Sequence, residues 1–198
     1  EDKSFIPNIT FSVPSYVLKL NSDKTPDFFV QDLKFKKKTI KIYYINHHIS
    51  HASSFFFSGF DNSAILTLDA FGEKQSGGFY IGKKNEINKL DSFYFPHSLG
   101  SFYSTFTEIC GFQPQSDEWK LMGASAYGIK SNNIFYKKIR NLVDLYKNGK
   151  FELNLKYFNH YMFHRPYFFN KKLLTHLNIK KNKKSNLSQK YYNLSYAA

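Results

Sequence analysis

The pair His47 and His51 constrains the fold of this chain more than any other feature. The pair follows a β-rich run at residues 40–45. Asn46, which lies between this run and His47, is a residue type that often caps the N-terminus of a helix. A helix is therefore predicted to begin at this point and to continue to about Ser58. Because residues i and i+4 of a helix share one face, both imidazoles are expected to point the same way.

A carboxylate follows this helix at the end of a second β-rich run. Residues 59–62 predict a turn, and residues 64–69 predict a buried strand that ends at Asp69. A carboxylate at that strand end could join the two imidazoles in a three-ligand metal site with an open coordination position, as a catalytic metal requires. Two histidines and one carboxylate suit iron, zinc or manganese. A pair of histidines with a purely structural role is the alternative.

The rest of the pattern contains both strands and helices. Strands at residues 78–82 and 87–95 are separated by a polar turn, which predicts a hairpin or meander. Helical spacing of apolar residues and terminal glycines predict three helices, at residues 98–109, 117–127 and 133–147. A further strand is predicted at residues 151–157, whereas the prolines within residues 1–39 break any long element there. This order of elements predicts an α/β fold.

Composition narrows the class of protein. With 42% hydrophobic and 19% aromatic residues, the chain can form a packed core. A net charge of +13 would suit nucleic acid, but the lysines lie in short scattered groups, so we favour a solvated surface and expect no nucleic-acid partner. The single cysteine, Cys110, fits a reducing compartment and a buried position. No apolar run could span a membrane, so we expect no membrane partner and take the cytoplasm as the default location.

Three segments of the chain follow one another at a distinctive spacing. They are residues 46–56 (NHHISHASSFF), residues 66–73 (LTLDAFGE) and residues 95–128, which begin FPHSLGSFYS and include EWKLMG and a final AYG. As a set they resemble the nodulation-protein-type O-carbamoyltransferases. The resemblance covers about residues 40–165 well and the flanks loosely.

The resemblance implies an actin-like ATPase (ribonuclease H-like) domain, related to enzymes that place threonylcarbamoyl on tRNA adenosine. This chain would hold part of the first lobe, with a mixed sheet and flanking helices. In such proteins carbamoyl phosphate and ATP give carbamoyl adenylate in a separate domain, and the actin-like domain transfers the carbamoyl group to a hydroxyl of a sugar or natural product. By the resemblance, His47, His51 and Asp69 match the metal ligands, and iron is the expected ion.

Further residues are candidates for catalysis near this site. We assign catalytic roles to His48 and Glu73; His48 could instead support the ligands, and Glu73 could be a solvated turn residue. Gly72, in the turn after the strand, would leave backbone N–H groups facing phosphate oxygens of ATP or its adenylate. His160 and His164 repeat the four-residue spacing, but the Arg-Pro step that follows disfavours a helix, so we assign no second metal site there.

Three residues of the third segment are candidates for nucleotide binding. His97 precedes a predicted helix N-terminus, where an anion would be stabilised, and packing at a proline turn is the alternative. Glu118 and Lys120 are assigned to the same site, with an exposed helix pair as the alternative. The family usually has glycine at the positions of Ala70 and Asp117. The charge of Asp117 would oppose a nucleotide unless a cation or water screens it.

The resemblance also suggests how the chain is divided. We expect an N-terminal flank (1–39), an incomplete carbamoyltransferase core (40–178), and a polar linker with the start of a truncated helix (179–198). A second lobe and an adenylate-forming domain are expected outside the chain, so the isolated fragment is expected to be inactive. The expected function is metal-assisted carbamoyl transfer, with carbamoyl phosphate, ATP and a small hydroxyl acceptor as partners. A non-catalytic remnant and a basic RNA-binding module are the alternatives.

Overall fold

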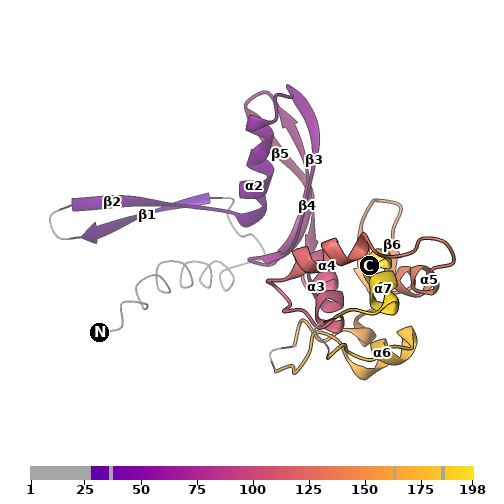
Figure 1. Cartoon of the computed structure of the whole chain (residues 1–198). Coiled ribbons are helices and arrows are strands. Elements are labelled where there is room, and N and C mark those ends of the chain that lie inside the picture. Colours follow the sequence, from indigo (N-terminus) through magenta and orange to yellow (C-terminus); the bar gives the residue numbers. More distant parts are fainter. Residues whose placement is uncertain (1–27, 36–37, 163, 184–185) are drawn as a thin grey trace. The chain divides into compact units, whose positions relative to one another are not determined.

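A computed structural model describes residues 28–35, 38–162, 164–183 and 186–198 of the chain (Figure 1). The chain divides into two compact units, which we describe separately. The first comprises the described residues of Glu1–Thr67 together with Phe71–Ser92, and the second comprises Leu68–Ala70 and Phe93–Ala198. The prolines of residues 1–27 lie outside the described residues. In the described part, no helix is long and apolar enough to cross a membrane.

The first unit begins with an antiparallel hairpin of β1 (Phe28–Phe35) and β2 (Lys38–Ile45). Phe29 pairs with Tyr44 across the hairpin, and their rings stack with centroids 4.5 Å apart. The sequence predicts β2 but no long element within residues 1–39, whereas β1 forms beyond Pro26, the last proline of that flank. The prediction for residues 28–35 is therefore wrong.

Helix α2 (His47–Ala52) starts where the sequence predicts. The Asn46 side chain accepts hydrogen bonds from the backbone N–H groups of His48 (3.0 Å) and Ile49 (3.2 Å), which is the N-cap interaction. The α-helix ends six residues before the predicted end, and a 3₁₀ helix continues it over Ser53–Phe57. The Ser53 hydroxyl donates to a backbone carbonyl of the preceding turn, a local bond of the kind that competes with α-helix.

A three-stranded meander follows, as predicted, with its strands in the order β3 (Asn62–Gly72), β4 (Gln75–Lys83) and β5 (Glu86–Tyr94). Two residues join each pair of strands, a connection that only antiparallel neighbours allow. Glu73 (φ 51°) and Lys84 (φ 52°) supply the left-handed residue of the two turns. Helix α2 packs on β4.

The second unit is mainly helical. Its elements are α3 (Leu99–Ile109), α4 (Glu118–Ser125), α5 (Ile134–Arg140), the antiparallel pair β6 (Val143–Leu145) and β7 (Phe151–Leu153), α6 (Lys171–Leu177) and α7 (Gln189–Ala197). The buried face of α3 includes Phe102, Phe106 and Ile109, at the spacing that predicts this helix. Cys110 is buried as expected, and burial raises the pKa of its thiol to about 12.

Three differences from the predicted elements lie in this unit. The helix predicted over residues 133–147 ends at Arg140, because Val143–Leu145 pair with Phe151–Leu153 instead. The strand predicted over 151–157 is correspondingly short, and Leu155–Tyr157 form a 3₁₀ helix. Helix α6 has no counterpart among the predictions. The described strands thus form three small antiparallel sheets in place of a mixed sheet, within the α/β class that the sequence predicts.

Candidate functional site

The structure brings His47, His51 and Asp69 together. One ligand atom from each side chain lies within 4.8 Å of the other two. The imidazoles lie edge to face on α2, with their Nε2 atoms 3.0 Å apart. Asp69 lies on β3, the strand that follows α2 and its 3₁₀ extension in the chain.

These donors fit a divalent metal ion. Imidazole nitrogens bind such an ion at about 2.0–2.1 Å, so two of them on one ion lie roughly 3 Å apart, close to the separation in this structure. Two nitrogens and one carboxylate oxygen leave further coordination positions for a substrate. Within the described residues, these three are the group of clustered donors that could hold an ion. Metal binding itself stays a prediction.

Gly72 has a role at this site that the sequence analysis did not foresee. A Cβ placed on Gly72 would lie 2.2 Å from Cγ and 2.3 Å from Cβ of His47, far inside van der Waals contact. Residue 72 therefore has to be glycine for the His47 side chain to lie against the strand. The predicted role of its backbone in phosphate binding stays a prediction.

His48 and Glu73 connect α2 to β4 and to the turn that precedes β4. His48 is fully buried, and its Nε2 lies 3.1 Å from the carbonyl oxygen of Gln75. Because a carbonyl only accepts, that nitrogen must carry the proton. The Glu73 carboxylate accepts a hydrogen bond from the His47 backbone N–H at 3.3 Å. These contacts give both residues a clear positioning role, and their catalytic roles stay predictions.

Two residues near the site were not assigned from the sequence. The Ser98 hydroxyl donates to the carbonyl oxygen of Asp69 at 2.9 Å, and Gly100 lies against the backbone of Asp69 and Ala70. Ser98, the first residue of the predicted helix, is the N-cap of α3. Contact with a strand 29 residues earlier is a long-range feature that no local pattern encodes.

A family model described as the carbamoyltransferase N-terminus matches residues 5–192. The chain belongs to this family. The resemblance to nodulation-type carbamoyltransferases is thereby confirmed.

Individual relatives of this carbamoyltransferase region are much longer than the matched segment. An uncharacterized protein of Synechocystis is 43% identical over 115 residues, which are 58% of this chain and 18% of the relative. Nodulation protein NolNO of Sinorhizobium fredii is 39% identical over 89 residues, 44% of this chain and 13% of that protein. Nodulation protein NolO of Bradyrhizobium diazoefficiens is 39% identical over 85 residues, 42% and 15% respectively. The match thus spans less than a fifth of each relative.

The proposed nucleotide residues of the carbamoyltransferase region have partners within the second unit. His97 Nδ1 accepts a hydrogen bond from the Leu153 backbone N–H at 3.0 Å. The Glu118 carboxylate accepts from the backbone N–H of Gln115 at 2.6 Å and from the hydroxyl of Ser104. His97 therefore accepts a long-range hydrogen bond from β7, and Glu118 stabilises the start of its own helix. For both residues a part in nucleotide binding stays a prediction.

Lys120 places a cation beside Asp117. Its Nζ lies 2.9 Å from the Asp117 carboxylate. This hydrogen bond, with another from the Gln113 backbone, lowers the pKa of Asp117. The negative charge of Asp117 is thus balanced by a neighbour one turn along the chain.

His160 and His164 do not form a second ligand pair. His160 is buried, and its Nε2 donates to the carbonyl oxygen of Pro96 at 2.8 Å, while His164 is exposed. Burial lowers the pKa of His160, the hydrogen bond to Pro96 acts in the opposite direction, and the positive charge of Arg165 lowers the pKa further. His160 is therefore a structural histidine that favours the neutral form.

This shift predicts a pH-dependent stability. The folded pKa of His160 lies below its unfolded value of about 6.5, so the unfolded chain binds the proton more readily. Stability is fully present above the unfolded pKa and falls as the pH is lowered toward the folded pKa. We expect the free energy of urea unfolding to fall less between about pH 7.5 and about pH 5.5 for His160→Gln than for wild type. His164→Gln is the matched control, and an unchanged pH dependence in His160→Gln would contradict the assignment.

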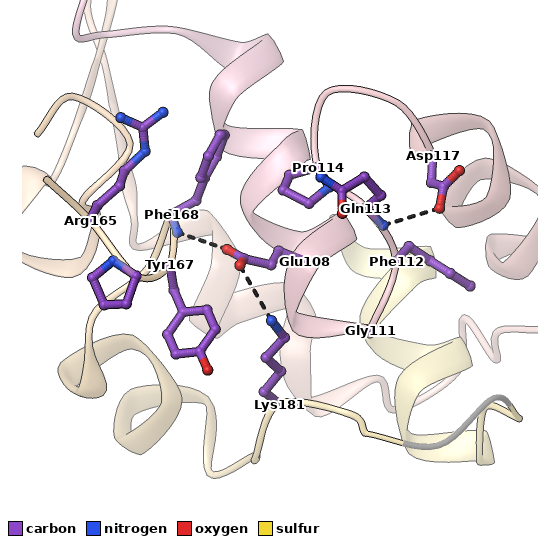
Figure 2. Close-up of a pocket in the computed structure, with 11 residues that line it drawn as sticks. Glu108, Gly111, Phe112, Gln113, Pro114, Asp117, Arg165, Tyr167, Phe168 and Lys181 are labelled. Atoms are coloured by element: carbon purple, nitrogen blue, oxygen red, sulfur yellow. Dashed lines mark hydrogen bonds and ion pairs between the residues drawn. The ribbon is translucent and has the colours of Figure 1, made fainter. Parts of the chain in front are cut away.

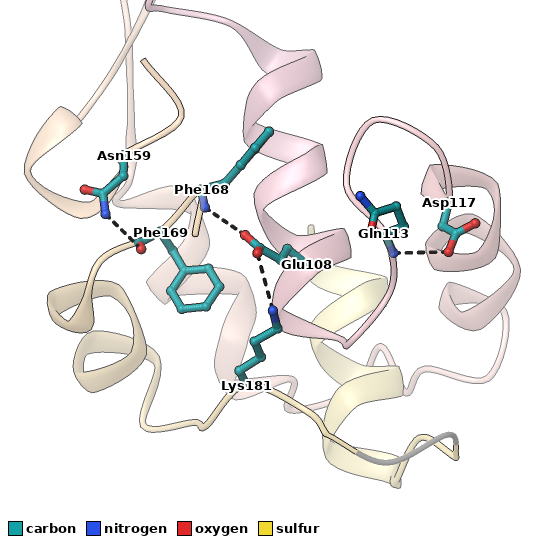
Figure 3. Close-up of polar contacts among 7 residues, drawn as sticks. All are labelled: Glu108, Gln113, Asp117, Asn159, Phe168, Phe169 and Lys181. Atoms are coloured by element: carbon teal, nitrogen blue, oxygen red, sulfur yellow. Dashed lines mark hydrogen bonds and ion pairs between the residues drawn. The ribbon is translucent and has the colours of Figure 1, made fainter. Parts of the chain in front are cut away.

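A cavity of about 670 Å³ in the second unit has a buried carboxylate in its wall (Figure 2). Glu108 accepts a hydrogen bond from the Phe168 backbone N–H at 2.7 Å and forms an ion pair with Lys181 at 3.3 Å (Figure 3). Arg165 stacks over Phe168 and donates to the Met162 carbonyl. All the charged side chains of this wall have partners within the unit, so we assign the cavity a structural role.

Glu108 is accordingly expected to contribute to stability through its acceptor. Glu108→Ala leaves the buried Phe168 N–H without its acceptor, which should lower the free energy of unfolding by about 1–3 kcal/mol. Glu108→Gln keeps a carbonyl acceptor and should cost less. Urea denaturation followed by circular dichroism would compare the two. Equal losses would show that the charge, and not the acceptor, is what stabilises this region.

Proposed function

We propose that this chain is part of a metal-dependent carbamoyltransferase, and that His47, His51 and Asp69 hold its divalent ion. The observation that carries the proposal is the convergence of these three donors within 4.8 Å in a chain of the carbamoyltransferase N-terminus family. We expect iron, with zinc or manganese as alternatives. When bound, the ion would supply positive charge beside an adenylate phosphate and the carbonyl to be transferred.

The proposed reaction moves a carbamoyl group from carbamoyl adenylate to a hydroxyl. A bond forms between the acceptor oxygen and the carbonyl carbon, the bond from that carbon to the phosphate oxygen breaks, and AMP leaves. The acceptor proton needs a base, for which Glu73 is our candidate: its carboxylate lies beside the start of α2, at His47. His48 would hold α2 in place through its bond to Gln75.

The remaining parts of the reaction are assigned to a longer protein, because the matched segment covers less than a fifth of the relatives. We propose that the chain contributes to an actin-like domain, and that a further lobe and an adenylate-forming domain lie elsewhere in that protein. Carbamoyl phosphate and ATP would be the substrates of the adenylate-forming step. A sugar or another small molecule with a free hydroxyl would be the acceptor.

The test uses the longer protein that contains this chain. Pyrophosphate release from ATP should require carbamoyl phosphate, and sugars with free hydroxyls should gain the mass of one carbamoyl group. Elemental analysis of the same preparation should find close to one metal ion per chain. If pyrophosphate release does not depend on carbamoyl phosphate and no sugar is modified, the proposal is wrong.

A further inference from the structure

The N-terminal turn of α3 holds the backbone of β3 at Asp69. Ser98 is fully buried, and its hydroxyl donates to the Asp69 carbonyl at 2.9 Å while accepting from the Ser101 backbone N–H at 2.9 Å. The one hydroxyl thus caps the helix and fastens the strand. Ser98 and Asp69 belong to the same compact unit.

Gly100 makes this approach sterically possible. A Cβ on Gly100 would lie 2.3 Å from the backbone nitrogen of Ala70 and 2.5 Å from the carbonyl carbon of Asp69. Both are backbone atoms, so neither could move aside without moving the strand. The resembled family usually has glycine at the position of Ala70, and here a glycine on the helix provides the close approach.

The same backbone nitrogen orients the carboxylate. The Ala70 N–H donates to Asp69 Oδ1 at 2.6 Å. Gly100 therefore packs against the group that fixes one carboxylate oxygen of a candidate ligand. Displacing Ala70 would therefore turn or release that carboxylate.

We propose that Ser98 and Gly100 are positioning residues that aim the Asp69 carboxylate at the metal. This inference rests on the proposed metal site. Partners that orient a metal ligand typically change metal affinity by about 10–100-fold. Loss of either contact should therefore weaken metal binding while α3 remains folded.

The test measures Co²⁺ affinity of the chain by visible absorption and competition with a chelator, beside circular dichroism. We expect Gly100→Ala to weaken Co²⁺ binding at least about tenfold and to change the absorption of bound Co²⁺. Gly123→Ala is the matched helix control, because a Cβ at that position meets nothing within 4 Å, and its Co²⁺ affinity should equal that of wild type.

Ser98→Ala provides a second test, and it removes a hydroxyl group instead of adding a methyl group to a packed position. Asn133→Ala is its control, since Asn133 caps α5 through its own side chain and lies away from Asp69 in the chain. Both alanine variants should lower stability, because each removes a helix N-cap. Only Ser98→Ala should weaken Co²⁺ binding, and Ser98→Thr should bind Co²⁺ as wild type does.

The outcomes separate this inference from the proposed function. If wild type binds Co²⁺ and His51→Ala does not, while Gly100→Ala and Ser98→Ala bind as wild type, the metal site stands and the positioning role is overturned. If wild type binds no Co²⁺, the proposed metal site fails and this inference fails with it.

Discussion

We expect His51→Ala to keep its fold and lose its metal. The side chain is exposed at the end of α2, so its removal leaves the core intact, yet its Nε2 is one of three clustered donors. Loss of an outer-shell partner costs about 10–100-fold in metal affinity, so loss of a ligand should cost at least about a hundredfold. Elemental analysis and Co²⁺ titration of the purified chain would measure this effect, and His47→Ala should give the same result.

His164→Ala is the matched control for these variants. This histidine is also exposed, and it does not belong to the donor cluster found among the described residues. Its metal content should equal that of wild type. Retention of wild-type affinity in both His47→Ala and His51→Ala would remove the metal assignment.

In the longer protein, His51→Ala should also separate the two proposed half-reactions. Carbamoyl transfer should be lost, whereas pyrophosphate release that requires carbamoyl phosphate should continue at the wild-type rate, because it is assigned to another domain. Loss of both activities together, in a protein that remains folded, would contradict this division of labour.

Gly72→Ala is expected to disrupt the same site without touching a ligand. The new methyl group would lie 2.3 Å from Cβ of His47, which is fixed to the helix backbone, so α2 has to shift on the sheet. Overpacking of this kind typically costs about 1–3 kcal/mol of stability. Because α2 carries two of the three donors, Co²⁺ affinity should fall about as far as in His51→Ala.

A double-mutant cycle can assign this effect to the contact itself. In a His47→Gly background the colliding atoms are absent, so Gly72→Ala should cost much less stability than it does in wild type. Gly123→Ala, which meets nothing within 4 Å, should not weaken metal binding. Equal costs of Gly72→Ala in both backgrounds would show that the strand, and not His47, resists the added methyl.

The predictions from sequence were most accurate where short-range interactions decide the structure. Asn46 caps α2 through bonds to residues two and three positions away, as the sequence predicts. The meander follows from short turns between alternating runs. In contrast, residues 143–145 continue a helical pattern but pair with β7, because a partner strand offers them backbone bonds that the pattern does not reveal.

For the candidate site, the order of residues alone determines that His47 and His51 share a helix face, because the period of the helix sets it. Tertiary structure decides that Asp69 of β3 joins them, that Gly72 leaves room for one imidazole, and that Ser98 and Gly100 hold the strand. Each of these contacts joins residues at least 18 positions apart. Contacts over such sequence distances depend on how the sheet and the helices pack. The side-chain volume at the contact decides whether the two segments can approach, and local periodicity does not reveal it.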